Sequence, residues 1–156
     1  MDQKSDSRIQ IICSNHRALC FDESIIGPWV CEKAGGTWVP GRGTAIGQVK
    51  DGQLSAGVLY EDWNGVNVVC HIRGDGSWAN RKFLNVIFDY PFNQLGVRRI
   101  TTPICSTNIK SINLVQKMGF ALESVLARAT PQGDLLLFRM FKHECRYIGK
   151  RYACVK

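Results

Sequence analysis

The sequence predicts a single mixed α/β domain, and its length and two patterns carry that prediction. The 156 residues, 45% of them hydrophobic, can bury a core without disulfides or metals. Strand-like runs between turn residues fill the first part of the regular region, and helix-like periods then alternate with further strands. A strand, a helix and a second parallel strand cross over right-handedly, which places helices against the sheet. We expect a mixed sheet of about six or seven strands with helices on both faces.

Three segments differ in pattern within this one domain of residues 1–156. Residues 1–43 are expected to be irregular and partly helical, and Gly27-Pro28 should break any helix that precedes it. Residues 44–141 carry the regular core, and residues 142–156 form a basic tail without a clear period. The sequence shows neither a secretory signal nor an apolar run long enough to span a membrane. We therefore expect a cytoplasmic protein with no membrane partner.

The core begins with an antiparallel meander of three strands. Residues 44–49 and 54–60 flank the turn Lys50-Asp51-Gly52, an arrangement typical of a hairpin. Asn64-Gly65 is a second strong turn signal and leads into a strand over residues 66–72.

A helix and a strand follow the meander. Apolar residues recur at helical spacing over residues 80–95, and Pro91 inside this stretch should kink the helix or shorten it. Gly96 ends the helix. Residues 97–105 are the next strand, in which Pro103 lacks an amide proton and indicates a bulge or an unpaired edge.

A second helix and a hairpin complete the core. The Asn108 side chain can accept a hydrogen bond from an amide of the first turn and so cap a helix that runs through Lys117, before Gly119 stops it. Strands over residues 120–128 and 135–141 then form the hairpin. The predicted order is thus a meander, a helix, a strand, a helix and two strands.

Charge is divided unevenly along the chain, which carries a net charge of +7. Residues 1–78 hold 7 Lys and Arg against 9 Asp and Glu, whereas residues 79–156 hold 13 against 4. A basic C-terminal half suits an anionic partner, such as nucleic acid, a phosphorylated cofactor or an acidic protein face. The tail interleaves basic residues with Tyr147 and Tyr152, which also suits nucleic acid, but a solvated terminus is the simpler interpretation.

Seven cysteines are an odd number in a chain large enough to fold without disulfides, so we expect them to be reduced. Cys70 and Cys105 lie in apolar strand-like runs, where a thiol behaves as a small hydrophobic group. The spacing Cys13-x2-His16-x3-Cys20 is similar to a metal motif, but no second ligand pair stands at a usual distance. No metal site is expected.

One segment resembles a known family. Residues 108–120, Asn-Ile-Lys-Ser-Ile-Asn-Leu-Val-Gln-Lys-Met-Gly-Phe, resemble the Asn-x-x-Ser/Ala…Lys-x-Gly-Phe signature of the GNAT superfamily of acetyltransferases. The preceding residues 88–100 fit the third helix and fifth strand of that family. The resemblance covers about residues 44–147. Within the superfamily, the sequence is most similar to the ribosomal-protein N-terminal acetyltransferases. Through residues 133–146 it extends to compact acetyltransferase-like proteins of tailed phages.

The resemblance implies acetyl-CoA as the cofactor. In the family, two parallel strands splay apart, pantetheine pairs with an exposed strand edge, and the pyrophosphate sits on free amides at the start of the next helix. The spacing of Gly74 and Gly76 departs from the family's usual loop, and the charges of Arg81 and Lys82 could compensate. The residues implied for cofactor binding are Cys70, His71, Ile72, Arg73, Gly74, Gly76, Ser77, Asn80, Arg81, Lys82, Asn108 and Ser111.

The resemblance also implies residues for catalysis. Many family members place a Tyr on the helix that follows Asn108 to protonate the leaving thiolate, and Val115 stands at that position here. Ser111, one turn earlier, matches a Ser of the ribosomal-protein branch and could stabilise the thiolate by a hydrogen bond, with a plain surface Ser as the alternative. Glu123 follows Gly119-Phe120 at a spacing that recurs in the same branch.

Acetyl transfer to an amine also needs a base for the amine proton. His71 has an unperturbed pKa suited to this task, and strand alternation puts its side chain on one face with Arg73. A structural His on a sheet face is the alternative interpretation. The further candidates, which could relay a proton through water, are Glu61, Asp62 and Glu123.

The leading hypothesis is an acetyl-CoA-dependent N-acetyltransferase that acts on an amine of a protein or a small molecule. The alternative is a phage effector of the same fold that binds and modulates a host bacterial protein in the host cytoplasm, because the altered loop and the missing Tyr leave catalysis reduced or lost. A nucleic-acid-binding domain is a weaker third hypothesis. Acetyl-CoA and an amine are thus the expected partners, and a homodimer is a further possibility. The fold alone does not identify the acceptor.

Overall fold

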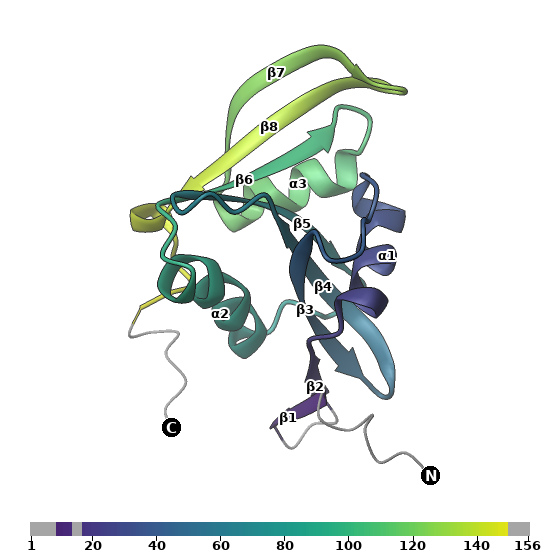
Figure 1. Cartoon of the computed structure of the whole chain (residues 1–156), viewed down its shortest axis with the longest axis vertical. Helices are drawn as coiled ribbons and strands as arrows, with labels where there is room; N and C mark the ends of the chain where they lie inside the picture. Colours follow the sequence, from purple (N-terminus) through teal and green to yellow (C-terminus); the bar gives the residue numbers. More distant parts are fainter. Residues whose placement is uncertain (1–8, 14–16, 150–156) are drawn as a thin grey trace.

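The computed structural model of the chain describes residues 9–13 and 17–149. Figure 1 shows one twisted sheet with helices packed against it. The elements in chain order are β1 Ile9–Cys13, β2 Arg17–Cys20, α1 Glu23–Ala34, β3 Gly43–Lys50, β4 Gln53–Glu61, β5 Asn67–Gly74, α2 Arg81–Asp89, the π-helix η2 Tyr90–Gln94, β6 Arg99–Cys105, α3 Ile109–Met118, β7 Ala121–Thr130, β8 Gly133–Phe141 and the short 3-10 helix η3 Lys142–Glu144.

The sheet is mixed, and its strands lie in the order β1-β2-β3-β4-β5-β6-β8-β7. Neighbouring strands are antiparallel except β5 and β6, which run parallel and are joined through α2. α1 packs on one face against Ala45 and Leu59, whereas α2 and α3 share the core of the other face with Val58 and Val68. The predicted fold class is confirmed, and the N-terminal strands β1 and β2 extend the described sheet to eight strands.

The N-terminal region is more regular than its sequence predicts. Residues 17–20 form a strand because they pair with β3, and Leu19 and Cys20 are buried there. The expected break at Gly27-Pro28 is wrong, since α1 continues through both residues. Ile26 and Val30 are fully buried against the sheet, and this packing outweighs the hydrogen bond that Pro28 cannot donate.

Asn80, Asn108, Pro91 and Gly119 act as their sequence positions predict. The side chain of Asn80 caps α2 by accepting a hydrogen bond from the amide of Phe83, and that of Asn108 caps α3. α2 ends before Pro91, which lies in the π-helix η2 that follows. Gly119 ends α3 in the left-handed conformation with φ of 103°.

A gap opens between the two parallel strands. β5 and β6 pair only from Asn67↔Arg99 to Val69↔Thr101, although both strands continue. β6 remains paired with β8 as far as Cys105 and β5 with β4 as far as Gly74, so the sheet splits between β5 and β6. Pro103 lies beyond the last pair of β5 and β6, which confirms the predicted unpaired edge. The diverging ends leave strand edges free for a ligand.

The described first half of the basic tail packs on the core instead of extending into solvent. The Tyr147 ring is buried and stacks on Phe88, with 4.9 Å between the ring centroids. The Arg146 guanidinium donates a hydrogen bond to the carbonyl of Lys117 at the end of α3. Residues 150–156, and with them Tyr152, lie outside the described residues.

Among the described helices, none combines the length and the hydropathy that a bilayer-spanning helix requires.

Candidate functional site

The gap between β5 and β6 opens into a groove of about 500 Å³. Its lining comes from the end of α1, the end of β5 with the loop that follows, and one face of α3. The basic residues Lys33, Arg73, Lys110 and Lys117 face a single carboxylate, that of Asp75. A groove with this excess of positive charge fits a ligand that carries phosphate groups.

Six of the residues predicted for cofactor binding line this groove: Ile72, Arg73, Gly74, Gly76, Asn108 and Ser111. The Arg73 guanidinium is already held on the α1 side, where it lies 3.9 Å from the Trp29 ring centroid and donates to the Trp29 carbonyl and to Asp75. Arg73 therefore shapes the wall of the groove, and Lys33, Lys110 and Lys117 are the other basic residues of its lining.

The structure does not bring the other predicted cofactor residues into the groove lining. The Cys70 side chain points into the core, where burial raises the pKa of its thiol to about 12, so only its backbone borders the gap. The Asn80 side chain is used within the fold, because it caps α2 and bonds to Gln48. Ser77, Arg81 and Lys82 also stay outside the lining.

Sequence reasoning missed several residues of the groove. Lys110, Asn113, Leu114 and Lys117 recur at helical spacing, so the face of α3 that carries Ser111 could have identified them. Lys33, Ala34 and Trp78 carry no comparable local signal, since only the packing of α1 and of the loop after β5 brings them to the gap.

Asn108 joins α1 to α3 across the gap. Its Nδ2 donates a hydrogen bond of 3.1 Å to the carbonyl oxygen of Lys33, and its Oδ1 accepts one of 3.3 Å from the amide of Ser111. Lys33, Ala34 and Asn108 line both the basic groove and a second cavity, also of about 500 Å³. The bridge therefore lies in the wall that these two cavities share.

A small third cavity, which we name the passage, shares lining residues with both of these cavities. It has room for about 10 Å³, roughly one water molecule. His71 from β5 and Ser111 from α3 both line it, and Val115 closes it from the helix. The structure thus places the predicted base and the predicted thiolate partner at one point, between the groove and the second cavity.

His71 lies beside a buried carboxylate. Its Nε2 is 3.4 Å from Oε2 of Glu61, and the side chains are only 11% and 8% exposed. Burial lowers the pKa of His71, while the charges of Glu61 and Asp62 oppose this fall and that of Arg42 adds to it. A histidine with a lowered pKa is neutral at neutral pH, which is the form that accepts a proton.

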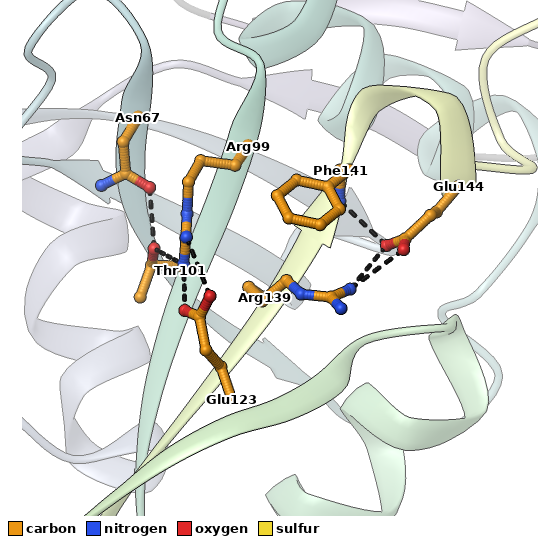
Figure 2. A network of polar contacts seen from close by, with 7 residues as sticks. All are labelled: Asn67, Arg99, Thr101, Glu123, Arg139, Phe141 and Glu144. Atoms are coloured by element: carbon orange, nitrogen blue, oxygen red, sulfur yellow. Dashed lines mark hydrogen bonds and ion pairs between the residues drawn. The ribbon is translucent and has the colours of Figure 1, made fainter.

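Glu123 does not belong to this group, contrary to the sequence prediction. Figure 2 shows its carboxylate paired with Arg99 at the opposite end of β6, where Thr101 and Asn67 continue the network. The hydrogen bond from Arg99 lowers the pKa of Glu123, so this carboxylate is a poor base. Glu123 lines neither the groove nor the passage nor the second cavity. The spacing after Gly119 could not reveal the pairing partner.

The described thiols differ in environment, and Cys105 should react first. Hydrogen bonds with Thr107 and Thr130 lower its pKa, and Cys105 lines the second cavity. Burial raises the pKa of Cys70 and Cys145. We expect iodoacetamide to modify Cys105 before these two in the folded protein, as peptide mass spectrometry would show. Modification of Cys70 at the rate of Cys105 would contradict the buried position of Cys70.

No metal site is expected at the Cys13-x2-His16-x3-Cys20 spacing. The side chains of Cys13 and His16 lie outside the described residues. Cys20, Cys31, Cys70, Cys105 and Cys145 are free thiols. No cluster of three His, Cys, Asp or Glu side chains suited to a metal occurs among residues 17–149. That all seven cysteines are reduced and that none binds zinc stay predictions, which elemental analysis would check.

The fold and the site together define a transferase scaffold, with a phosphate-compatible groove and a second cavity that meet at a His and a Ser. A family model described as acetyltransferase (GNAT) domain matches residues 41–133, so the chain belongs to the GNAT acetyltransferases. These enzymes use acetyl-CoA, and the basic groove fits that cofactor. A search of curated proteins finds no match to the sequence.

Solved structures share the fold at low sequence identity. Spermidine N-acetyltransferase from Vibrio cholerae in complex with CoA and spermine is 13% identical, with a TM-score of 0.64 over 87% of this chain and 100% of that chain. The spermidine/spermine N-acetyltransferase from the same organism in complex with manganese ions is 14% identical, with a TM-score of 0.63 over 81% of this chain and 92% of that chain. A GNAT-family acetyltransferase from Bacillus anthracis is 13% identical, with a TM-score of 0.54 over 64% of this chain and 67% of that chain.

Proposed function

We propose that this chain is an acetyl-CoA-dependent N-acetyltransferase that acetylates the amine of a small molecule. The observation that carries the proposal is the passage where His71 and Ser111 meet, with a basic groove on one side and a second cavity on the other. Acetyl-CoA supplies the acetyl group as an activated thioester. Lys33, Lys110 and Lys117 would hold its phosphates by charge.

The residues of the passage divide the proton chemistry between them. Neutral His71 accepts the proton that the amine loses as it is acylated, since its lowered pKa keeps the imidazole unprotonated at neutral pH. The Ser111 hydroxyl donates a hydrogen bond to the sulfur as negative charge develops there. Val115 has no proton to offer, so Ser111 is the polar side chain of α3 in the passage. A Ser in this role supports the narrower assignment to the ribosomal-protein branch.

The second cavity, which we name the acceptor cavity, indicates which amines would fit. Among its lining residues Glu32 is the single carboxylate and Lys33 the single ammonium group. The apolar part of the lining comes from Ala34, Pro103, Ala129, Pro131 and Leu135. A spermine molecule carries several positive charges and would find one carboxylate here. We therefore favour an acceptor with one amine on an uncharged, partly apolar body over a polyamine.

Calorimetry with acetyl-CoA tests the groove. We expect saturable binding that weakens as salt is added, because the contacts to the phosphates are ionic. Replacing both Lys110 and Lys117 with Ala should weaken binding about tenfold, the equivalent of one good charged contact. Lys82→Ala is the matched control, since this exposed Lys lies outside the groove lining. Equal affinities for the double variant and the control would show that the phosphates bind elsewhere.

Turnover with a panel of monoamines and polyamines tests the reaction itself. Acetyl-CoA consumption with monoamines, and little with spermine, is the expected result. Binding of acetyl-CoA without turnover would favour the alternative, a protein of this fold that binds a host bacterial protein. The exposed residues Leu122, Val125 and Leu126 on the edge strand β7 would suit a protein partner in that case, whether a host protein or a second copy of this chain.

A further inference from the structure

Glu61 is buried with one of its two carboxylate oxygens unpaired. Oε2 faces Nε2 of His71, whereas Oε1 has no hydrogen-bond partner among the described residues and almost no exposed surface. The close packing around Glu61 also requires a glycine at position 43, because a Cβ there would lie 2.0 Å from the carbonyl oxygen of Tyr60 and 3.1 Å from Cγ of Glu61. A buried, unpaired carboxylate oxygen calls for a water molecule as its partner.

A further cavity borders Glu61 and shares no lining residue with the passage. It has a volume of about 400 Å³, and Glu61 lines it together with Arg42 and Asp62. The Arg42 and Asp62 side chains form an ion pair there and are each about half exposed, so the cavity opens to solvent. We name it the exit cavity. His71 lines the passage and the acceptor cavity but not the exit cavity, whereas Glu61 lines only the exit cavity of these three.

His71 and Glu61 therefore link two spaces, the passage and the exit cavity, that share no lining residue. With a proton on Nε2 that points to Glu61, the neutral imidazole leaves the Nδ1 lone pair free to accept another. This tautomer is the one that a carboxylate beside Nε2 selects.

We propose that Glu61 positions His71 as the base for the acceptor amine and stabilises the imidazolium that forms, with a water molecule from the exit cavity as the partner of its Oε1. The inference rests on the proposed acetyl transfer. The amine forms the new C–N bond as the C–S bond breaks, and its proton passes to Nδ1 of His71. The Nε2–H stays in its contact with Oε2 of Glu61, whose negative charge stabilises the imidazolium that forms, while the water at Oε1 completes the partners of this carboxylate. After the product has left, His71 gives the Nδ1 proton to solvent, which restores the neutral tautomer for the next turnover.

Other charged groups also face His71, so the test must separate them. Asp62 and Arg42 act on it from the ends of β4 and β3, with opposite effects on its pKa. Glu32 and Lys33 of α1 and Cys105 of β6 line the acceptor cavity with it. Among the described carboxylates, only that of Glu61 makes direct contact with the imidazole. Removing the Glu61 charge takes away the largest contribution that raises the pKa of His71, so that pKa should fall further.

The experiment compares Glu61→Gln with Asp62→Asn, which removes the same charge one residue later at a half-exposed position. Carbon-13 NMR of labelled histidine measures the pKa of His71 in the protein without ligands, and loss of its signal in His71→Gln provides the assignment. We expect the pKa of His71 to fall in Glu61→Gln and to fall less in Asp62→Asn, because the Asp62 charge raises that pKa less than Glu61 does. Glu61→Asp, which keeps the charge, should restore part of the difference.

Kinetics supply the second measurement. In Glu61→Gln we expect kcat to fall about tenfold, acetyl-CoA affinity to stay unchanged, and the acidic limb of kcat/KM to move to lower pH. An unchanged His71 pKa, or a wild-type rate and pH profile in Glu61→Gln, would overturn this role of Glu61. Absence of turnover in the wild-type protein would instead overturn the proposed function. The two failures are thus distinguishable, and circular dichroism melting excludes misfolding as the cause of either.

Discussion

Replacing His71 with Gln should lower kcat by about 10²- to 10⁴-fold, the range that loss of a general base produces. Gln is the informative substitution because its amide can still donate a hydrogen bond to Glu61 from the position that Nε2 occupies. It cannot accept the proton of the amine. The buried carboxylate therefore keeps a partner, and the fold and acetyl-CoA affinity should remain close to those of the wild-type protein.

The pH dependence checks the same assignment. In the wild-type protein, kcat/KM should rise as His71 loses its proton, with the midpoint of this rise at a pH below the ordinary pKa of histidine, because burial lowers the pKa of this residue. His71→Gln should lose that rise. His143→Gln is the matched control, since His143 of η3 stacks on Phe141 of β8 and lines neither the groove nor the passage nor the acceptor cavity. A wild-type profile in His71→Gln would assign the base to another group.

Strong local signals in the sequence predicted most of the core correctly. The meander, the cap at Asn108, the stop at Gly119 and the interruption at Pro91 each depend on a few neighbouring residues, and the structure has all four. The strand alternation that puts His71 opposite Cys70 also holds, since Cys70 is in the core and His71 lines the passage.

The errors in the fold arise where distant contacts decide the conformation. Residues 17–20 contain good helix formers, yet pairing with β3 makes them a strand. Pro28 predicts a break, yet Ile26 and Val30 are buried deeply enough to keep α1 continuous. The sequence of residues 1–43 alone cannot predict the strand or the continuous helix, because β3 and the sheet face under α1 come later in the chain.

The site was predicted in part for the same reason. Ser111 and Asn108 sit in a recognisable segment, and the structure places both at the gap. Lys33 reaches the groove only because α1 packs across the sheet, and Glu61 meets His71 only because β4 and β5 pair. Glu123 has the expected spacing, but Arg99 holds it at the other end of β6.

Replacing Ser111 with Ala should lower kcat by about 10²-fold while leaving acetyl-CoA affinity within a few fold, as removal of one donor to a developing negative charge typically does. The change deletes a hydroxyl from the passage and no backbone contact, since it is the Ser111 amide that donates the hydrogen bond to Oδ1 of Asn108. Ser124→Ala on the exposed strand β7 is the matched control. The rate deficit should shrink with a thioester whose thiol has a lower pKa, because such a sulfur needs less stabilisation as it leaves. Equal turnover in Ser111→Ala and Ser124→Ala would leave water as the proton donor to the sulfur.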